Sequence, residues 1–121
     1  MLPERQRLRS GRDYSAVMRS GRRVGRSALV VHHVRPDPSI DRAGPRFGLI
    51  VSTAVGNAVV RHRVSRRLRH VLADRAAAVD PRTDIVVRAL RPAADADSAE
   101  LARQLDSALR RADLLREVDA R

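Results

Sequence analysis

The sequence of 121 residues contains no cysteine, no tryptophan and no lysine, and only one tyrosine and one phenylalanine. Without cysteine, the chain can form neither a disulfide bond nor a thiolate metal site. No apolar run approaches the length of a membrane-spanning helix, and the N-terminus lacks the apolar segment of a signal peptide. We therefore expect one cytoplasmic domain over residues 1–121, with a core at about 5–116, a basic N-terminal tail and a short C-terminal tail.

Acidic residues are scarce in the first part of the chain. Residues 1–73 hold sixteen arginines against four acids, whereas residues 74–121 hold nine arginines against ten acids. The net charge of +11 therefore belongs to one part of the molecule, as expected for a surface that binds a polyanion. Membrane surfaces are also anionic, but the most basic segment carries no Trp or Phe anchor. Nucleic acid is the better expected partner.

The most basic segment has the pattern of an amphipathic helix over about residues 57–77. Apolar residues recur there at helical spacing, namely Val60, Val64, Leu68 and Val71. Asn57, preceded by Gly56, is the expected N-cap. The other side of the helix consists of His62, Arg63, Arg66, Arg67, Arg69 and His70, with Arg61 on its flank. Because no acid occurs between Asp41 and Asp74, nothing within this helix neutralises the arginines, and the pattern favours polyanion binding over an ordinary solvated face.

The remaining pattern predicts an α+β fold. Helices are expected at 11–19 and 98–116, and strands at 22–24, 27–34, 46–52 and 84–90, which gives the order α-β-β-(β)-α-β-α. Ser10 and Asp97 are the expected N-caps of the two helices. We expect the second and third strands to form an antiparallel pair across the loop between them, and Asp106 to pair with Arg110 in the last helix.

Residue constellations for protein catalysis are missing from the sequence. The turn at Gly56 lacks the second glycine and the lysine of a phosphate-binding loop. Adjacent strand residues point to opposite faces, so His32 and His33 cannot both bind one ion, and no spacing of acids argues for hydrolysis. A DNA-binding helix-turn-helix is disfavoured, because a strand leads into the basic helix. If the chain takes part in a reaction, the catalytic groups are expected to come from elsewhere.

The run Gly56-Asn57-Ala58-Val59-Val60-Arg61-His62-Arg63, continuing to Arg66 and Arg69, resembles the basic helix of bacterial ribonuclease P protein subunits, where G-N-A-V-x-R-N-R-x-K-R-x-x-R is typical. Other segments match that family in the same order over about residues 5–115. They are Arg7-Leu8, Asp13-Tyr14-x-x-Val17-x-x-x-Gly21, Arg46-Phe47-Gly48-Leu49-x-Val51-Ser52, Asp84-Ile85-Val86-Val87-Arg88 and Arg91-Pro92.

The resemblance implies a two-layer α/β sandwich of the kind found in ribosomal proteins, with a small, mostly antiparallel sheet and a left-handed β-α-β crossover. It implies the protein subunit of a ribonucleoprotein that removes the 5′ leader from precursor tRNA. The RNA subunit performs the hydrolysis with Mg²⁺, which is bound by RNA and substrate and not by the protein. The partners of the protein are then the catalytic RNA and precursor tRNA. The resemblance also implies that the protein itself carries no catalytic residue and no metal ligand.

Two sets of site residues follow from the resemblance and the charge pattern. The expected contacts to the catalytic RNA are Asn57, Arg61, His62, Arg63, Arg66, Arg67 and Arg69. The expected cleft for the single-stranded leader is formed by Arg12, Tyr14, Met18, His32 and Ser52. The sequence departs from the family pattern at His62 and Ser65 in the basic helix, and at Met18 and His32 in the cleft, where aromatic residues are frequent.

Two other functions are compatible with the pattern. A non-enzymatic RNA-binding protein of the ribosome or of its assembly shares the α+β layout and the richness in arginine. A DNA-binding regulator is less well supported, since the usual motif is missing. Cleavage of precursor tRNA on addition of a catalytic RNA distinguishes the first function from both alternatives.

Overall fold

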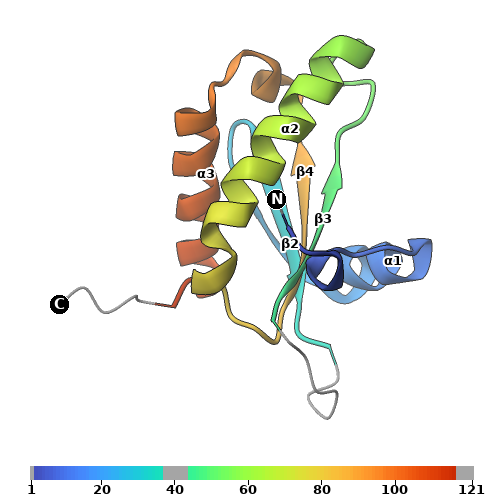
Figure 1. Cartoon of the computed structure of the whole chain (residues 1–121), viewed down its shortest axis with the longest axis vertical. Coiled ribbons are helices and arrows are strands. Elements are labelled where there is room, and N and C mark those ends of the chain that lie inside the picture. Colours follow the sequence, from blue (N-terminus) through green and yellow to red (C-terminus); the bar gives the residue numbers. More distant parts are fainter. Residues whose placement is uncertain (1, 37–43, 117–121) are drawn as a thin grey trace, which may run out of the picture.

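The computed structural model describes residues 2–36 and 44–116, and the predicted loop at 35–45 lies mostly outside this part. The helices are α1 (Gly11–Ser20), α2 (Ala58–Arg75) and α3 (Ser98–Arg111). The strands are β1 (Arg22–Gly25), β2 (Leu29–Val34), β3 (Arg46–Ile50) and β4 (Asp84–Ala89). Three short 3-10 helices complete the described part, η1 (Glu4–Gln6), η2 (Ala76–Ala78) and η3 (Arg91–Asp95) (Figure 1). The α+β prediction is confirmed.

The four strands form one sheet in the order β1-β2-β4-β3. β2 pairs antiparallel with β1 and with β4, and β3 pairs parallel with β4. The expected antiparallel pair of β2 and β3 is therefore wrong, because β4 lies between them. Ile85, Val86 and Val87 of β4 are fully buried, so this strand has apolar side chains on both faces and suits the centre of the sheet.

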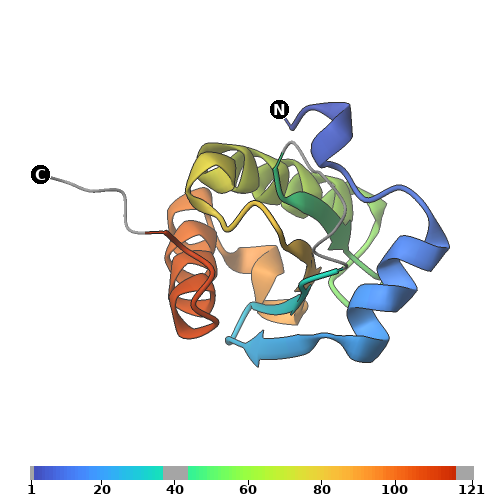
Figure 2. The same ribbon diagram turned by 90° about the horizontal axis from the view of Figure 1, so that it is seen from below.

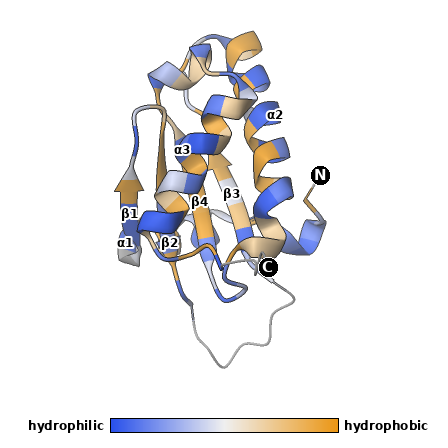
Figure 3. Ribbon diagram, turned by 90° about the vertical axis from the view of Figure 1, so that its left-hand side faces the viewer, coloured by the Kyte–Doolittle hydropathy of each residue, from blue (hydrophilic) through white to orange (hydrophobic). Residues whose placement is uncertain are grey.

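The connection from β3 through α2 to β4 is a left-handed crossover. In Figure 3 the two parallel strands run upward, α2 lies on the viewer's side of the sheet, and β4 lies to the left of β3. Such connections are right-handed in about 98% of parallel β-α-β units. The crossover in this chain is one of the rare left-handed ones, as expected from the family resemblance.

Helices cover both faces of the sheet, as Figure 2 shows in a view along the strands. The main core lies between the sheet and the helices α2 and α3, and it includes Leu68, Leu72, Leu101 and Leu105. A smaller core lies between the other face and α1, around Val17 and Val86. The apolar stripe predicted for α2 is confirmed, since Val64, Leu68 and Val71 are buried.

Side-chain caps begin each of the three α-helices where the sequence predicted them. Ser10 Oγ accepts from the Asp13 N–H at 3.1 Å, Asn57 Oδ1 from the Val60 N–H at 3.0 Å, and Asp97 Oδ1 from the Glu100 N–H at 2.8 Å. The helix ends differ from the predictions. α2 ends at Arg75 and continues as η2, and α3 ends at Arg111 rather than at residue 116.

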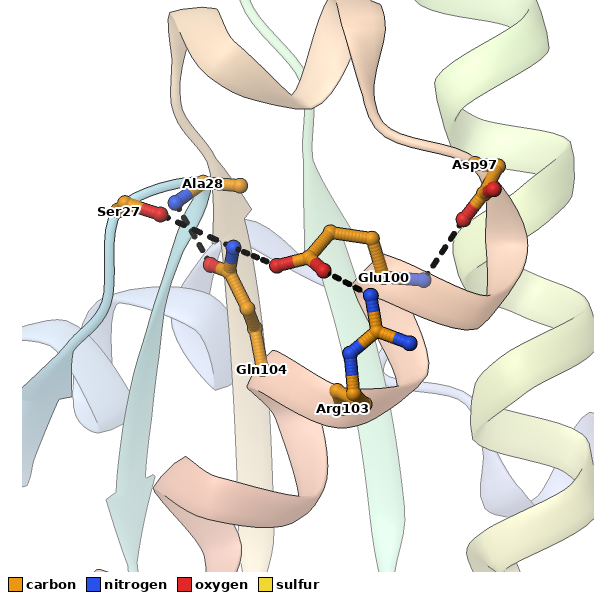
Figure 4. Close-up of polar contacts among 6 residues, drawn as sticks. All are labelled: Ser27, Ala28, Asp97, Glu100, Arg103 and Gln104. Atoms are coloured by element: carbon orange, nitrogen blue, oxygen red, sulfur yellow. Dashed lines mark hydrogen bonds and ion pairs between the residues drawn. The ribbon is translucent and has the colours of Figure 1, made fainter.

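Two polar networks tie α3 to the rest of the fold. Gln104 Oε1 accepts from the Ala28 N–H at 2.8 Å, and its Nε2 donates to Ser27 Oγ and Glu100 Oε2, which fixes the β1–β2 turn (Figure 4). Asp106 binds Arg75 of α2 through two hydrogen bonds, of 2.5 and 3.0 Å. The predicted Asp106–Arg110 pair is therefore wrong, because the carboxylate turns toward the neighbouring helix.

Candidate RNA-binding surfaces

The side of α2 that faces away from the core carries His62, Arg66 and Arg69. At 100° per residue these three positions fall within an arc of about 60°. All three side chains are exposed, and Arg66 and Arg69 have no hydrogen bond or ion pair with any residue that the structure describes. We call His62, Arg66 and Arg69 the open face of α2. Its guanidinium groups keep their donors available for a phosphate.

Arg63 and Arg67 lie on a different side of the same helix and are half-buried. Arg63 donates from NH2 to the Ala94 carbonyl at 3.1 Å, and Arg67 donates from NH1 to the Ala96 carbonyl at 2.8 Å. Ala94 belongs to η3, and Ala96 directly follows it. These two arginines therefore hold the segment between β4 and α3 against α2, and part of their donor capacity is already used.

Arg61 and Asn57 serve the first turn of α2. The Arg61 Nε donates to the Gly56 carbonyl at 3.3 Å, and the Asn57 side chain is occupied as the N-cap. A Cβ on Gly56 would lie 2.8 Å from Val60 Cγ1, so the turn requires glycine on steric grounds. The seven residues predicted to contact the catalytic RNA thus divide into an open face and a set with structural contacts. Their contact with RNA stays a prediction.

On the other face of the sheet, the Tyr14 ring lies on Gly48. A Cβ at Gly48 would come within 2.5 Å of the ring, so only glycine leaves room for it. The Tyr14 hydroxyl accepts a hydrogen bond from the Leu49 N–H at 3.2 Å. Tyr14 is half-buried and has a structural contact, which the sequence alone did not indicate. Its predicted role in leader binding stays a prediction.

Met18 and His32 lie on the same side of the sheet as Tyr14. Met18 packs against the small core around Val86, and Val86 is the register partner of His32 in β2. His32 is buried, and its Nε2 accepts from the Nε of Arg88 at 3.5 Å. The other two predicted cleft residues, Arg12 and Ser52, are exposed, and Ser52 Oγ accepts from the Ala54 N–H at 3.3 Å.

Two basic residues beside His32 were missed by the sequence analysis. Arg88 lies two residues after Val86 on β4, so its side chain is on the same face of the sheet as those of Val86 and His32. Arg23 of β1 is the register partner of His32. Both add positive charge to the side of the sheet that carries α1. Arg88 could have been identified from its place inside the apolar run 84–90, because an arginine in a central strand requires that one face of the sheet be open or polar at that point.

Stability should depend on pH through His32. Burial lowers the pKa of His32, and the charges of Arg88, Arg23 and His33 lower it further. The unfolded chain takes up a proton below about pH 6.5, whereas the folded chain does so only at lower pH. The free energy of unfolding should therefore fall as the pH falls through this window. His33 contributes in the same direction, because its pKa is lowered by burial and by Arg22.

Replacing His32 by glutamine should flatten this dependence. Urea unfolding of the wild type and of His32→Gln at several pH values below 7 measures it, with His62→Gln as a control for loss of an exposed imidazole. Parallel curves for wild type and His32→Gln would show that His32 is not the group responsible.

Within residues 2–36 and 44–116, no group of three or more His, Asp or Glu side chains is placed to hold a metal ion. No helix in this part is long and apolar enough to cross a membrane.

A layered α+β fold with a left-handed crossover and an open basic helix suits the class of small proteins that bind a polyanion such as RNA. The family model for ribonuclease P matches residues 2–113. The ribonuclease P protein component of Rhodococcus erythropolis is 55% identical over 119 residues, covering 95% of this chain and 94% of that protein. That of Streptomyces bikiniensis is 51% identical over 116 residues, covering 92% and 94%.

Solved structures agree with these relatives. The RNase P protein of Staphylococcus aureus has a TM-score of 0.80 at 26% identity, covering 91% of this chain and 97% of that one. The fold is also that of the RNase P protein of Thermotoga maritima, with a TM-score of 0.71 at 22% identity, covering 84% and 92%. The chain belongs to the ribonuclease P protein family, whose place is in tRNA processing. The ribosomal and DNA-binding alternatives are not favoured.

Proposed function

We propose that the chain, as the protein subunit of ribonuclease P, binds the catalytic RNA through the open face of α2 and the precursor-tRNA leader on the α1 side of the sheet. The RNA subunit then removes the leader by hydrolysis, with Mg²⁺ held by RNA and substrate. The observation that carries the proposal is the open face itself, in which two exposed arginines have no partner among the described residues. We place this activity in the cytoplasm.

Electrostatics support the RNA contact. Guanidinium groups that lack an acidic partner bind phosphates and release counterions, and this supplies most of the sequence-independent affinity for a nucleic acid. Arg63 and Arg67 support the same contact indirectly, since they fix η3 beside α2. The proposal therefore gives Arg66 and Arg69 the larger share of phosphate contacts, and Arg63 and Arg67 a positioning role.

Binding of the leader is supported by the composition of the α1 side. Tyr14 and Met18 provide half-buried apolar surface, against which an unpaired base can pack. Around this surface, the phosphate backbone of the leader can contact the guanidinium groups of Arg12, Arg23 and Arg88. With a single aromatic ring, base stacking is weaker here than on a two-ring platform, so backbone contacts carry more of the affinity.

Reconstitution tests the proposed function. Purified protein free of RNA should leave precursor tRNA intact, and catalytic RNA alone should cleave slowly at low Mg²⁺. The two together should cleave at the mature 5′ end much faster, because the protein's cations offset phosphate repulsion between the RNA and its substrate. Cleavage by the protein without RNA, or no gain over RNA alone, would overturn the proposal.

A further inference from the structure

A cavity of about 300 Å³ lies between the N-terminal segment, α1, β3 and α2. Its lining includes Tyr14 and Phe47, which are the only two aromatic residues in the chain. Leu8 and Leu72 add apolar wall, and Arg7 and Arg69 add two guanidinium groups. None of the lining residues is acidic. Phe47 is only 3% exposed and belongs to the main core, so Tyr14 supplies the accessible ring. One half-buried ring beside two guanidinium groups suits the packing of a nucleobase next to its phosphates.

The walls of this cavity are fixed by hydrogen bonds within the protein. The Leu8 N–H donates to the Phe47 carbonyl at 2.8 Å, which attaches the N-terminal segment to the free edge of β3. The Arg7 Nε donates to the Leu2 carbonyl at 3.1 Å, and the Tyr14 hydroxyl is held by the Leu49 N–H. A ligand would therefore enter a preformed site without having to order the chain.

Arg69 connects this cavity to the open face of α2. It lines the cavity and also belongs to the same narrow arc of the helix as His62 and Arg66. An RNA strand whose phosphates contact Arg66 continues within one helical turn to Arg69, and from there to the cavity. Arg7 lies in the same lining, and its contact with the Leu2 carbonyl uses only Nε. Its two terminal nitrogens have no hydrogen-bond partner among the residues that the structure describes.

We propose that this cavity receives one unpaired nucleobase of the catalytic RNA. The base packs against the exposed part of the Tyr14 ring and against Leu49, the half-buried leucine of the lining, while phosphates next to it contact Arg69 and Arg7. The inference rests on the proposed function, since it requires that RNA lies along α2. It gives the N-terminal segment a direct role in binding the RNA subunit and gives Tyr14 a second surface besides the one toward the leader.

Filling the cavity tests the proposal. Leu49 is half-buried and lines the cavity without carrying charge, so Leu49→Phe should occupy the space of the base and leave the arginines in place. Affinity for the catalytic RNA should fall about tenfold, as expected for the loss of one base contact, with no change in the slope of log K against log salt. Leu115→Phe, at a half-buried leucine outside this lining, is the matched control, and unfolding midpoints of both variants show whether they fold.

Chemical probing of the catalytic RNA locates the base. The wild-type protein should protect the Watson–Crick face of one unpaired nucleotide, and Leu49→Phe should restore its reactivity while other protections remain. A second measurement does not depend on the larger side chain. Because the chain has no cysteine, Leu49→Cys, at a half-buried position of the lining, offers a single attachment point for a photo-crosslinker at the cavity, with Arg110→Cys on α3 as the control.

The outcomes separate the two proposals. Unchanged affinity of a folded Leu49→Phe, or no crosslink to a defined unpaired nucleotide from position 49, would overturn the cavity proposal alone. A loss confined to precursor tRNA with a leader would assign the cavity to the leader and would also overturn it. Failure of the wild-type protein to bind the catalytic RNA would instead overturn the proposed function.

Discussion

Replacing Arg46 by methionine should lower the free energy of unfolding by about 3 kcal/mol, the low end of what is measured when one partner of a buried ion pair is removed. Arg46 binds Asp84 through two hydrogen bonds, Nε to Oδ1 at 3.0 Å and NH2 to Oδ2 at 2.7 Å. Asp84 is only 4% exposed, so the substitution leaves its carboxylate without this cation inside the fold. Arg46 also lies 3.7 Å from Asp13, and its loss should loosen α1 as well.

Urea unfolding measures this effect, and Arg35→Met is the matched control. Arg35 binds Asp80 at 2.5 Å, but its side chain is 57% exposed, so the loss should be at most about 1 kcal/mol. In a double-mutant cycle, Arg46→Met and Asp84→Ala together should cost less than the sum of the two single changes, because both substitutions remove the same pair of hydrogen bonds. Equal losses for Arg46→Met and Arg35→Met would contradict a special role of the Arg46–Asp84 pair.

Local patterns in the sequence were enough to predict the elements and their caps. The spacing of Val64, Leu68 and Val71 predicted the buried side of α2, and Asn57 predicted where its first turn begins. These features depend on residues three or four apart, whose geometry in a helix is fixed. The order of the strands depends on which strand can be buried on both faces. The run Ile85-Val86-Val87 contained that information, but the assumption that consecutive strands pair led to the wrong neighbour for β3.

The sequence predicted those features of the candidate site that depend on a single helix, but not those that depend on contacts with other segments. The basic residues of α2 were identified, but periodicity could not tell Arg66 from Arg67. What distinguishes them is a carbonyl 29 residues away in the sequence, because Ala96 accepts from Arg67. The same holds for Tyr14, whose hydroxyl meets the Leu49 N–H only after α1 has docked on the sheet. Contacts between distant segments decide which cations and rings stay free.

This division of α2 predicts opposite results for two pairs of substitutions. Replacing Arg66 and Arg69 together by glutamine should weaken binding of the catalytic RNA and flatten the slope of log K against log salt by about 1.5 units, at roughly 0.7–0.9 units for each lost phosphate contact. The fold should be nearly unaffected, because neither side chain has a partner among the described residues. Replacing Arg63 and Arg67 by glutamine should instead lower the unfolding midpoint, since the hydrogen bonds to Ala94 and Ala96 are lost.

Titration of each double variant with catalytic RNA at several salt concentrations, together with urea unfolding, checks both halves of this prediction. Arg110→Gln with Arg111→Gln removes the same charge from exposed positions on α3 and controls for net charge alone. If that control flattened the slope as much as the open-face variant does, the effect would come from total charge and not from contact. The opposite result is that the Arg63 and Arg67 variant flattens the salt slope more than the Arg66 and Arg69 variant does, with no change in its unfolding midpoint. That result would mean that the RNA lies on the side of α2 that faces η3. The proposed strand path from Arg66 to Arg69, and with it the route to the cavity, would then be wrong.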